Sequence, residues 1–373
     1  MTDSEISIKI VDTLLSVSET DWDACAAPEA VDEARPLDPF TTYRFLRALE
    51  ESGSVGNATG WHPYYILAIS GNQLLGCAPM YVKTHSQGEY IFDHSWANAY
   101  ERAGGKYYPK IQVAVPFTPV PGKRLLANNE NQEKAFPILL EGIKSFAAKN
   151  NLSSAHITFC TFDEFKKGGS LGLLKRTSSQ YHWKNDGYEN FQDFLDALSS
   201  RKRKNIRKER ERAKSFGGEI VRYSGKEITE QHWDAFWNFY QDTGRRKWGQ
   251  PYLTRNFFEI AGERLENELL MILAEIDGNP IAGALNFIGQ DALFGRYWGC
   301  TENYSNLHFE ICYYQAIEYA IENRLSRVEA GAQGEHKLAR GYMPSHTYSL
   351  HWINNNSFSR AVSYTHLTLP TKA

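Results

Sequence analysis

The 373-residue chain contains little cysteine, and what it has is scattered. No C-x-x-C pair occurs, and the chain is too long for a small disulfide-stapled framework. Long apolar runs are missing too, and residues 1–9 are polar and acidic, so neither a membrane span nor a signal peptide is expected. These absences predict a cytoplasmic protein without a metal site. The five cysteines are Cys25, Cys77, Cys160, Cys300 and Cys312.

An excess of charge of either sign is also missing, because 41 Lys and Arg face 44 Asp and Glu, for a net charge of -3. No global field therefore draws the protein to nucleic acid or to a membrane. The exception is residues 201–214, where nine Lys or Arg face only Glu209 and Glu211. One interpretation is a solvated helix with partial internal pairing. The other is an arm that faces phosphate groups of a partner, which would be tRNA if the family resemblance given below holds. Its contact residues would be Arg201, Lys202, Arg203 and Lys204.

The length favours two domains, and the two halves show the same order of elements. Each half gives helices, a meander of strands, a long helix and a returning strand. In the first half, residues 89–96 (EYIFDHSW) are expected to be one of the strands. The predicted fold class is therefore α/β with mixed sheets, duplicated within the chain. We expect domains at 1–180 and 181–361, joined near residues 176–187.

Residues 293–344 carry the densest polar pattern of the sequence. A strand at 293–298, a helix at 308–324 and a short strand at 327–330 predict a right-handed parallel βαβ unit, followed by the loop GAQGEHKLARGY. Polar side chains concentrate where these strands end and the helix begins. In open α/β sheets, ligands bind at such places.

Two short motifs in the chain match known patterns but lack the right surroundings. Residues 168–172 fit G-x-S-x-G, but two lysines precede them where a nucleophile elbow needs a hydrophobic strand. Residues 73–78 fit the Q-x-x-G-x-A pattern that cradles a pyrophosphate. They lie in a predicted β-hairpin, where the sheet uses their amides.

Each polar residue of the 293–344 stretch also has a structural explanation. Arg296 could form an ion pair, and Glu310 could favour the first helical turn through the macrodipole. Their convergence at one sheet end instead favours a site for amine chemistry. We expect a proton acceptor there, and cations that bind anionic groups. The candidate proton acceptor is Glu310, with His308 and Glu335 as rivals. The expected substrate-binding residues are Arg296, Tyr297, Trp298 and His336. Donor binding is expected from Lys337, Arg340 and Gly334.

Several long segments resemble a bacterial family of FemAB-like predicted N-acyltransferases of the GNAT superfamily. They include HWKNDGYENFQDFLDALSSRKRKNIRKER, LHFEICYYQAIEYAI and GAQGEHKLARGYMP. The resemblance implies two tandem GNAT-like (acyl-CoA N-acyltransferase) domains and a role in peptidoglycan biosynthesis. It also implies transfer of an acyl or aminoacyl group to an amine, for example on a cell-wall precursor. The implied donor is acyl-CoA, such as acetyl-CoA, or aminoacyl-tRNA. Between these, the negative net charge and the confinement of the basic run to one helix favour the thioester.

The second half departs from that family pattern, because it shows no clear pyrophosphate loop. The alternative function is a non-catalytic GNAT-like module that binds RNA or a peptidoglycan precursor. The end of the chain, AVSYTHLTLPTKA, resembles a translated sequencing-adapter fragment. Residues 362–373 are therefore expected to be an artefact tail that takes no part in the fold.

Overall fold

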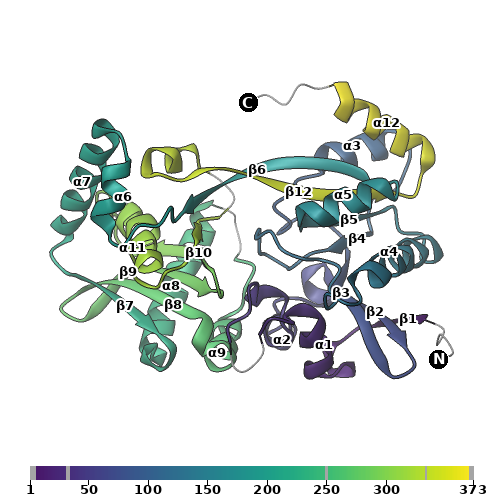
Figure 1. Ribbon diagram of the computed structural model, residues 1–373, viewed down its shortest axis with the longest axis horizontal. Helices are drawn as coiled ribbons and strands as arrows, with labels where there is room; N and C mark the ends of the chain where they lie inside the picture. Colours follow the sequence, from purple (N-terminus) through teal and green to yellow (C-terminus); the bar gives the residue numbers. More distant parts are fainter. Residues whose placement is uncertain (1–5, 31–33, 248–250, 332–333, 369–373) are drawn as a thin grey trace. The chain divides into compact units, whose positions relative to one another are not determined.

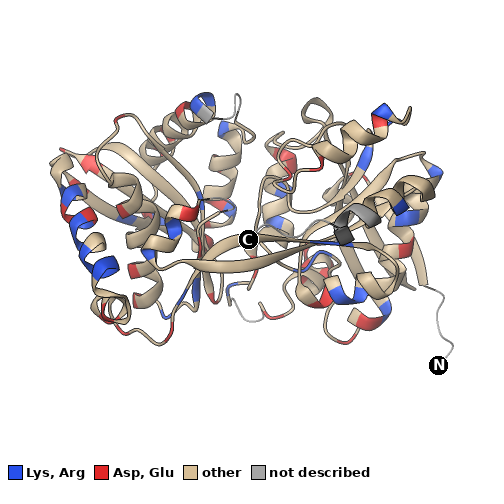
Figure 2. Cartoon of the chain, turned by 90° about the horizontal axis from the view of Figure 1, so that it is seen from above, with Lys and Arg blue, Asp and Glu red and all other residues tan. Residues whose placement is uncertain are grey.

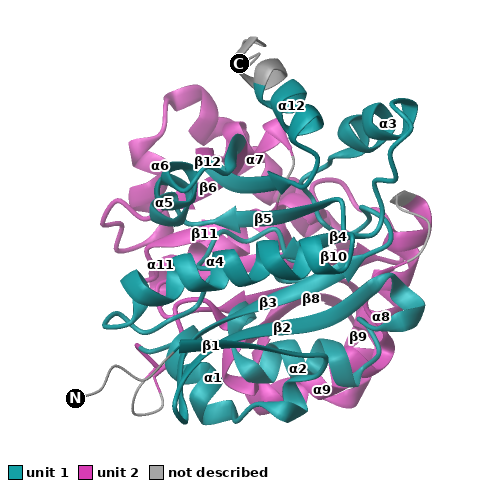
Figure 3. Ribbon diagram, turned by 90° about the vertical axis from the view of Figure 1, so that its right-hand side faces the viewer, with its two compact units in different colours: residues 1–28, 40–178, 346–373 teal, residues 29–39, 179–345 magenta. Residues whose placement is uncertain are grey.

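The computed structural model describes residues 6–30, 34–247, 251–331 and 334–368, and its chain divides into two compact units (Figures 1 and 3). Unit 1 comprises residues 1–28, 40–178 and 346–373, and unit 2 comprises residues 29–39 and 179–345. Each unit contains a run of antiparallel and parallel strands with helices packed on it, which is the α/β class that the sequence predicted.

The sheet of unit 1 has the strand order β1-β2-β3-β4-β5-β12. All neighbours are antiparallel except β4 and β5, which are parallel and are joined by α4 (Gln132–Lys149). The β2–β3 hairpin closes over Gly71, whose φ of 59° suits the tight turn. The strands are β1 (Ile6–Val11), β2 (Trp61–Ser70), β3 (Gln73–Lys83), β4 (Lys110–Val113), β5 (Ser154–Cys160) and β12 (Met343–Ile353).

Helices cover both faces of this sheet. The apolar stripe of α4, which includes Phe136 and Ile143, packs on Ile66 and Met80 of the strands. On the other face, Trp22 makes an edge-to-face contact with Tyr65, at 5.6 Å between ring centroids. The helices of unit 1 besides α4 are α1 (Glu19–Ala26), α2 (Tyr43–Glu51), α3 (His94–Arg102), α5 (Phe162–Ser170) and α12 (Asn356–Thr368).

The prediction of a strand at residues 89–96 is wrong. Tyr90 has a φ of 60°, which interrupts extended backbone, and helix α3 begins at His94.

The sheet of unit 2 has the strand order β6-β11-β10-β9-β8-β7. Its only parallel pair, among the described strands, is β10 with β11. Three consecutive helical segments join that pair: α10 (Leu307–Phe309), the π-helical turn η7 (Glu310–Tyr314) and α11 (Gln315–Glu322). The strands are β6 (Leu174–Lys184), β7 (Glu219–Ser224), β8 (Leu269–Ile276), β9 (Asn279–Ile288), β10 (Ala292–Cys300) and β11 (Arg327–Glu329).

Close packing of helix α8 (Glu230–Lys247) on this sheet depends on a glycine. A Cβ on Gly299 would come within 2.2 Å of the backbone oxygen of Phe239, so no larger residue fits there. Helix α9 (Arg255–Arg264) packs beside α8, and helices α6 (Phe191–Ala197) and α7 (Ser200–Ala213) belong with the crossover helix to the opposite face.

Each sheet receives its last strand from the other half of the sequence. Strand β12 pairs with β5 in unit 1, and β6 pairs with β11 in unit 2. The units therefore differ from the expected limits of 1–180 and 181–361, because the chain returns to unit 1 at His346. The expected junction at residues 176–187 is largely strand β6, since the open edge of β11 needs a hydrogen-bonding partner.

The expected artefact tail begins inside helix α12. Val362 is 4% exposed and packs in a small cluster with Trp96, Tyr107 and Ile353. Its side chain thus contributes to the packing of unit 1, whereas residues 369–373 lie outside the described part of the chain. Among the described residues, no helix has both the length and the apolar character needed to cross a bilayer.

Candidate functional site

Unit 2 contains a cavity of about 100 Å³ between one face of its sheet and the crossover helix. Strands β9 and β10 supply most of one wall, and α10 and η7 supply the other. The lining residues are Ala284, Asn286, Gly295, Arg296, Tyr297, Trp298, His308, Cys312, Tyr313 and Ala330.

The cavity forms because two strands stop pairing. The parallel ladder between β10 and β11 ends at the pair Phe294 and Glu329. In the next residues of β10 the register with β9 shifts, so that Arg296 is an extra residue between Gly295 and Tyr297. Such a β-bulge bends the strand and redirects a side chain, which is why bulges are frequent next to active sites.

The helix that faces the bulge is irregular too. In η7 the amide of Gln315 donates to the carbonyl of Glu310, which is the five-residue spacing of a π-helix. The sequence periodicity predicted one continuous helix over 308–324, so this widening is a finding of the structure. It falls on the segment that contributes Cys312 and Tyr313 to the cavity, and π-bulges occur frequently at functional sites.

Aromatic side chains form one end of the cavity. The His308 ring lies 5.0 Å from Trp298 and 5.5 Å from Tyr313, both edge to face. The hydroxyl of Tyr313 is 2.9 Å from Nε2 of His336, and burial raises the pKa of this tyrosine. The imidazole of His308 is thus held in a fixed position beside the bulge, where it can accept a proton.

Four of the residues expected in the site line this cavity together: Arg296, Tyr297, Trp298 and His308. Tyr297 contributes less than expected, because its ring packs against Tyr240 at 5.4 Å and Phe258 at 6.3 Å.

Glu310, the first candidate proton acceptor, does not line the cavity. Glu310 is 4% exposed. Its carboxylate accepts hydrogen bonds from Nε and Nη2 of Arg210 at 2.8–3.2 Å and from the side-chain Nε2 of Gln315 at 2.9 Å. These bonds use the acceptor positions of the carboxylate. The geometry therefore gives Glu310 the role of fastening α7 to the crossover helix.

The residues expected to bind the donor lie in and around the 3-10 helix η8 (Glu335–Arg340). Lys337 is 2% exposed, and its ammonium donates to the carbonyls of Ala330 at 2.6 Å and Gly331 at 3.0 Å. Burial lowers the pKa of Lys337 to about 8, so this lysine is mostly charged at neutral pH. Its charge lies directly behind the cavity wall that Ala330 forms.

None of the other four predicted residues of this segment lines the cavity: Gly334, Glu335, His336 and Arg340. Arg340 is buried, donates to Glu209 at 2.9 Å, and lies 3.4 Å from the ring centroid of Phe309. Gly334, with φ 116°, precedes the helix, and Glu335 is exposed. Their roles stay predictions.

The basic helix α7 divides into an inner and an outer face. Arg210 bridges Glu310 and Glu318, and Glu209 accepts from Arg340, so this part of the helix is anchored to unit 2. Among the predicted contact residues, Arg203 pairs with Asp196 at 2.7 Å. Arg201 and Lys204 are exposed and Lys202 is half-buried. The concentration of Lys and Arg on this helix is visible at the left of Figure 2.

Sequence reasoning missed Asn286, Gly295 and Cys312. Asn286 had a usable signal, since it is the only polar residue in the run PIAGALNFI. Gly295 and Cys312 had none, because a β-bulge and a π-turn depend on how strands and helix pack.

The loop that precedes the crossover helix bears on donor binding. Residues 301–306 (TENYSN) contain no glycine, carry the acidic Glu302, and end at Asn306 with φ 63°. The Glu302 carboxylate in this loop would repel a pyrophosphate, because both groups are negatively charged. Among the described residues, no three metal-ligating side chains converge on one point.

Unit 1 holds a second polar cluster, at the start of β4. The Lys110 ammonium is fully buried and donates to Glu89 at 2.7 Å, to Asp93 at 2.5 Å and to Ser86 at 2.9 Å. Lys83 lies nearby, 3.8 Å over the ring of Trp61. The Lys110 ammonium thus pairs with one oxygen of each carboxylate, as a buried charge needs in order to be tolerated. The second oxygens, Glu89 Oε1 and Asp93 Oδ1, have no hydrogen-bond partner within the described part of the chain.

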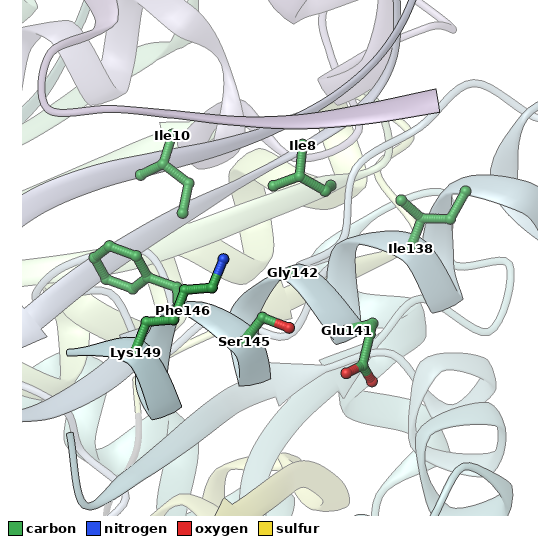
Figure 4. A pocket seen from close by; sticks show the side chains of 8 residues that line it. All are labelled: Ile8, Ile10, Ile138, Glu141, Gly142, Ser145, Phe146 and Lys149. Atoms are coloured by element: carbon green, nitrogen blue, oxygen red, sulfur yellow. The ribbon is translucent and has the colours of Figure 1, made fainter. Parts of the chain in front are cut away.

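A larger open hollow of about 620 Å³ lies in unit 1 between the edge strand β1 and helix α4. Ile8 and Ile10 point from β1 towards α4, and the one carboxylate, Glu141, points away from them (Figure 4). Gly142 permits the close approach, because a Cβ there would meet Ile66 at 2.7 Å. The hollow therefore offers mainly apolar contact, and its carboxylate is not directed at the apolar side chains of β1.

The fold and the site together define a class of protein. Two units, each with an antiparallel meander followed by a parallel pair around a crossover helix, make a tandem GNAT-like fold. In unit 2 this fold opens at a bulged strand beside an imidazole and a buried ammonium.

The chain belongs to the FemAB-like family, described as peptidoglycan biosynthesis/recognition, whose model matches residues 13–369. The match extends into the segment that the sequence suggested was an artefact. No curated protein matches the chain in sequence.

Solved structures share the fold at low sequence identity. The crystal structure of FemX is 12% identical, with 95% of this chain and 100% of that chain covered and a TM-score of 0.56. A conserved protein of unknown function from Bacteroides thetaiotaomicron is 10% identical, with 92% and 99% covered and a TM-score of 0.53. L-PGS from Bacillus licheniformis is 10% identical, with 90% and 98% covered and a TM-score of 0.52.

Proposed function

We propose that the protein transfers an acyl or aminoacyl group from an activated donor to an amine acceptor on a cell-wall precursor, and that the donor carbonyl lies in the cavity of unit 2. The observation that carries this proposal is the opening of the sheet at Arg296, which leaves space for a small group between a strand bulge and His308. A dry cavity of ~150 Å³ can hold benzene. About 100 Å³ thus suits a short acyl chain.

The mechanism needs one bond to form and one to break. The neutral acceptor amine attacks the donor carbonyl carbon, which forms the C–N bond and places negative charge on the carbonyl oxygen. Arg296 stabilises this oxyanion, and His308 takes the proton that the amine loses. When the C–O or C–S bond to the donor breaks, the same proton passes to the leaving oxygen or sulfur. No covalent enzyme intermediate is required.

Filling the cavity tests this proposal. A Cβ on Gly295 would meet its nearest neighbour, Oδ1 of Asn286, at 3.4 Å, which is an ordinary contact. Gly295→Ala should therefore fold normally and lose part of the transfer rate, and Gly295→Val should lose most of it. Thermal unfolding checks the fold, and transfer to a peptidoglycan-precursor amine measures the rate. Full activity in a well-folded Gly295→Val variant would refute the proposal.

Two features favour an aminoacyl-tRNA donor over acyl-CoA. The loop 301–306 lacks glycine and carries Glu302, which disfavours a CoA pyrophosphate. The outer face of α7 offers cations, including Arg201 and Lys204, that can pair with a nucleic acid backbone.

Binding of tRNA at several salt concentrations separates these donors. Replacing Arg201, Lys202, Arg203 and Lys204 together with Ala should weaken tRNA binding and flatten its log–log salt slope by about three to four. The matched control removes four exposed lysines from unit 1: Lys106, Lys134, Lys149 and Lys166. Binding of acetyl-CoA without tRNA would instead assign a thioester donor. Binding of either donor without transfer of its acyl or aminoacyl group would favour the non-catalytic binding module.

A further inference from the structure

One residue in the cavity has a polar atom that no described residue satisfies. Asn286 lies on β9 and is 1% exposed. Its Nδ2 donates to the carbonyl of Leu270 at 3.3 Å. Because a carbonyl oxygen can only accept a hydrogen bond, the NH2 end of the Asn286 carboxamide must face Leu270. Oδ1 therefore points the other way, and within the described part of the chain it has no hydrogen-bond partner.

The space at this oxygen exists because of a glycine. Asn286 and Gly295 are directly paired across β9 and β10, and both line the cavity. A Cβ at position 295 would be only 3.4 Å from Oδ1. The neighbours of Asn286 on the same face of β9, Ala284 and Ile288, belong to the apolar core. A lone carboxamide among them is costly unless a ligand supplies a donor.

We propose that Oδ1 of Asn286 accepts a hydrogen bond from an uncharged amine of a substrate held in this cavity, so that Asn286 determines specificity for amine-bearing substrates. The surrounding charges decide between an ammonium and a neutral amine. Arg296 lines the same cavity, and the Lys337 ammonium contacts the carbonyl of Ala330 at its wall. Two cations repel a third, whereas a neutral N–H meets no such penalty.

This inference rests on the proposed function and narrows its substrate class. Two amines fit the chemistry. One is the α-amino group of an aminoacyl donor, and the other is the attacking amine of the acceptor. An acetyl group has no N–H and would leave Asn286 unsatisfied, so the residue discriminates against simple acyl donors.

The first test measures stability without any ligand. Asn286→Leu removes the unsatisfied oxygen and keeps a branched side chain, so its melting temperature should equal or exceed that of the wild type. The control is Asn279→Leu, an exposed position on the same strand. A fall of more than about 4 °C for Asn286→Leu alone would show that the carboxamide is structural and would overturn the proposal.

The second test measures binding by NMR titration of the whole chain. The probes are alaninamide, its deaminated analogue propionamide, and n-butylamine. Each amine's affinity is expressed per concentration of its uncharged form, since alkyl amines are largely protonated at neutral pH. Alaninamide should bind more tightly than propionamide, and Asn286→Leu should lower the affinity for the relevant amine about tenfold. Selective loss of alaninamide assigns the donor amine, and loss of n-butylamine assigns the acceptor amine. If the Asn286→Leu variant does not fold, the Asn286→Ala variant replaces it in the same titrations.

Equal affinities for alaninamide and propionamide, or unchanged affinity of the variants for both amines, would overturn the inference. The outcome is separate from that of the proposed function, because these probes report binding without turnover. A wild type that binds amines through Asn286 but transfers nothing would refute the transferase activity alone.

Discussion

The two units differ at the same place in their topology, where the parallel pair of strands ends. In unit 1, at the end of the parallel ladder of β4 and β5, Gln112 donates to Thr158 Oγ1 at 2.7 Å and Arg124 donates to the Thr158 carbonyl at 3.0 Å. Both donors are buried. In unit 2, beyond the parallel pair of β10 and β11, Gly295 and the bulged Arg296 border a cavity.

The difference shows how one fold serves two purposes. In unit 1, Gln112, Arg124 and the Lys110 ammonium all donate to groups of the same unit. Some acceptor atoms of unit 1, including Gln112 Oε1, also have no hydrogen-bond partner among the described residues, so the clearer difference is the open space beside Gly295 in unit 2. Unit 2 keeps a glycine where a side chain would fill the space, and leaves Asn286 without a partner among the described residues. Function is a property of such sites and not of the fold. We therefore expect substitutions in unit 1 to change stability, and those around the cavity to change activity.

The largest expected effect concerns the buried ion pairs of unit 1. Lys110→Met leaves Glu89 and Asp93 buried without their shared cation, which should lower the free energy of unfolding by about 3–5 kcal/mol. Urea denaturation measures this change, and Lys106→Met, an exposed lysine in the same unit, is the control. A loss below about 1 kcal/mol would mean that the cluster is open to water and that the contrast with unit 2 is false.

The next effect concerns the bulged residue of unit 2. Arg296→Met should reduce kcat about 10²–10³-fold, since it removes the group that meets the developing oxyanion. The melting temperature should change little. The exposed Arg212→Met is the control for loss of one positive charge. If Arg296→Met retains kcat within about threefold, Arg296 has no part in the chemistry.

A smaller effect is the pH dependence of unit 1. Burial lowers the pKa of Lys83 to about 7, whereas the unfolded chain keeps the ordinary value near 10.5. Above pH 7 the folded state therefore binds fewer protons than the unfolded state, and stability from this group rises with pH. Between pH 7 and 8.5 the wild type should gain about 1 kcal/mol relative to Lys83→Met. Urea denaturation at both pH values checks this, and parallel curves for the two proteins would contradict it.

Much of the fold follows from local sequence patterns. The sequence predicted a β-hairpin around residues 73–78 and a long helix in the first half, and β2–β3 and α4 are those elements, because turn residues and helical periodicity are visible within one segment. The exchange of β6 and β12 was not predictable in this way. It depends on which distant strand completes each edge, and no local pattern records that choice.

The site divides similarly. Arg296, Trp298 and His308 line one cavity, which chain order alone makes understandable because it places a strand end beside the helix that follows it. Their roles stay predictions. It favoured Glu310, which the structure instead pairs with Arg210 from a helix about 100 residues earlier. A partner that far away cannot be identified from spacing.

The smallest expected effect tests whether the cavity acts by direct attack. Cys312 lines the cavity of unit 2 and is half-buried, whereas Cys25, Cys77 and Cys160 of unit 1 are buried. Because attack by the amine needs no covalent intermediate, Cys312→Ser should retain the transfer rate within about threefold. Intact-mass spectrometry of the wild type mixed with donor should show no acylated protein. An acyl adduct on Cys312, together with loss of transfer in a well-folded Cys312→Ser variant, would replace direct attack with a two-step transfer through the thiol.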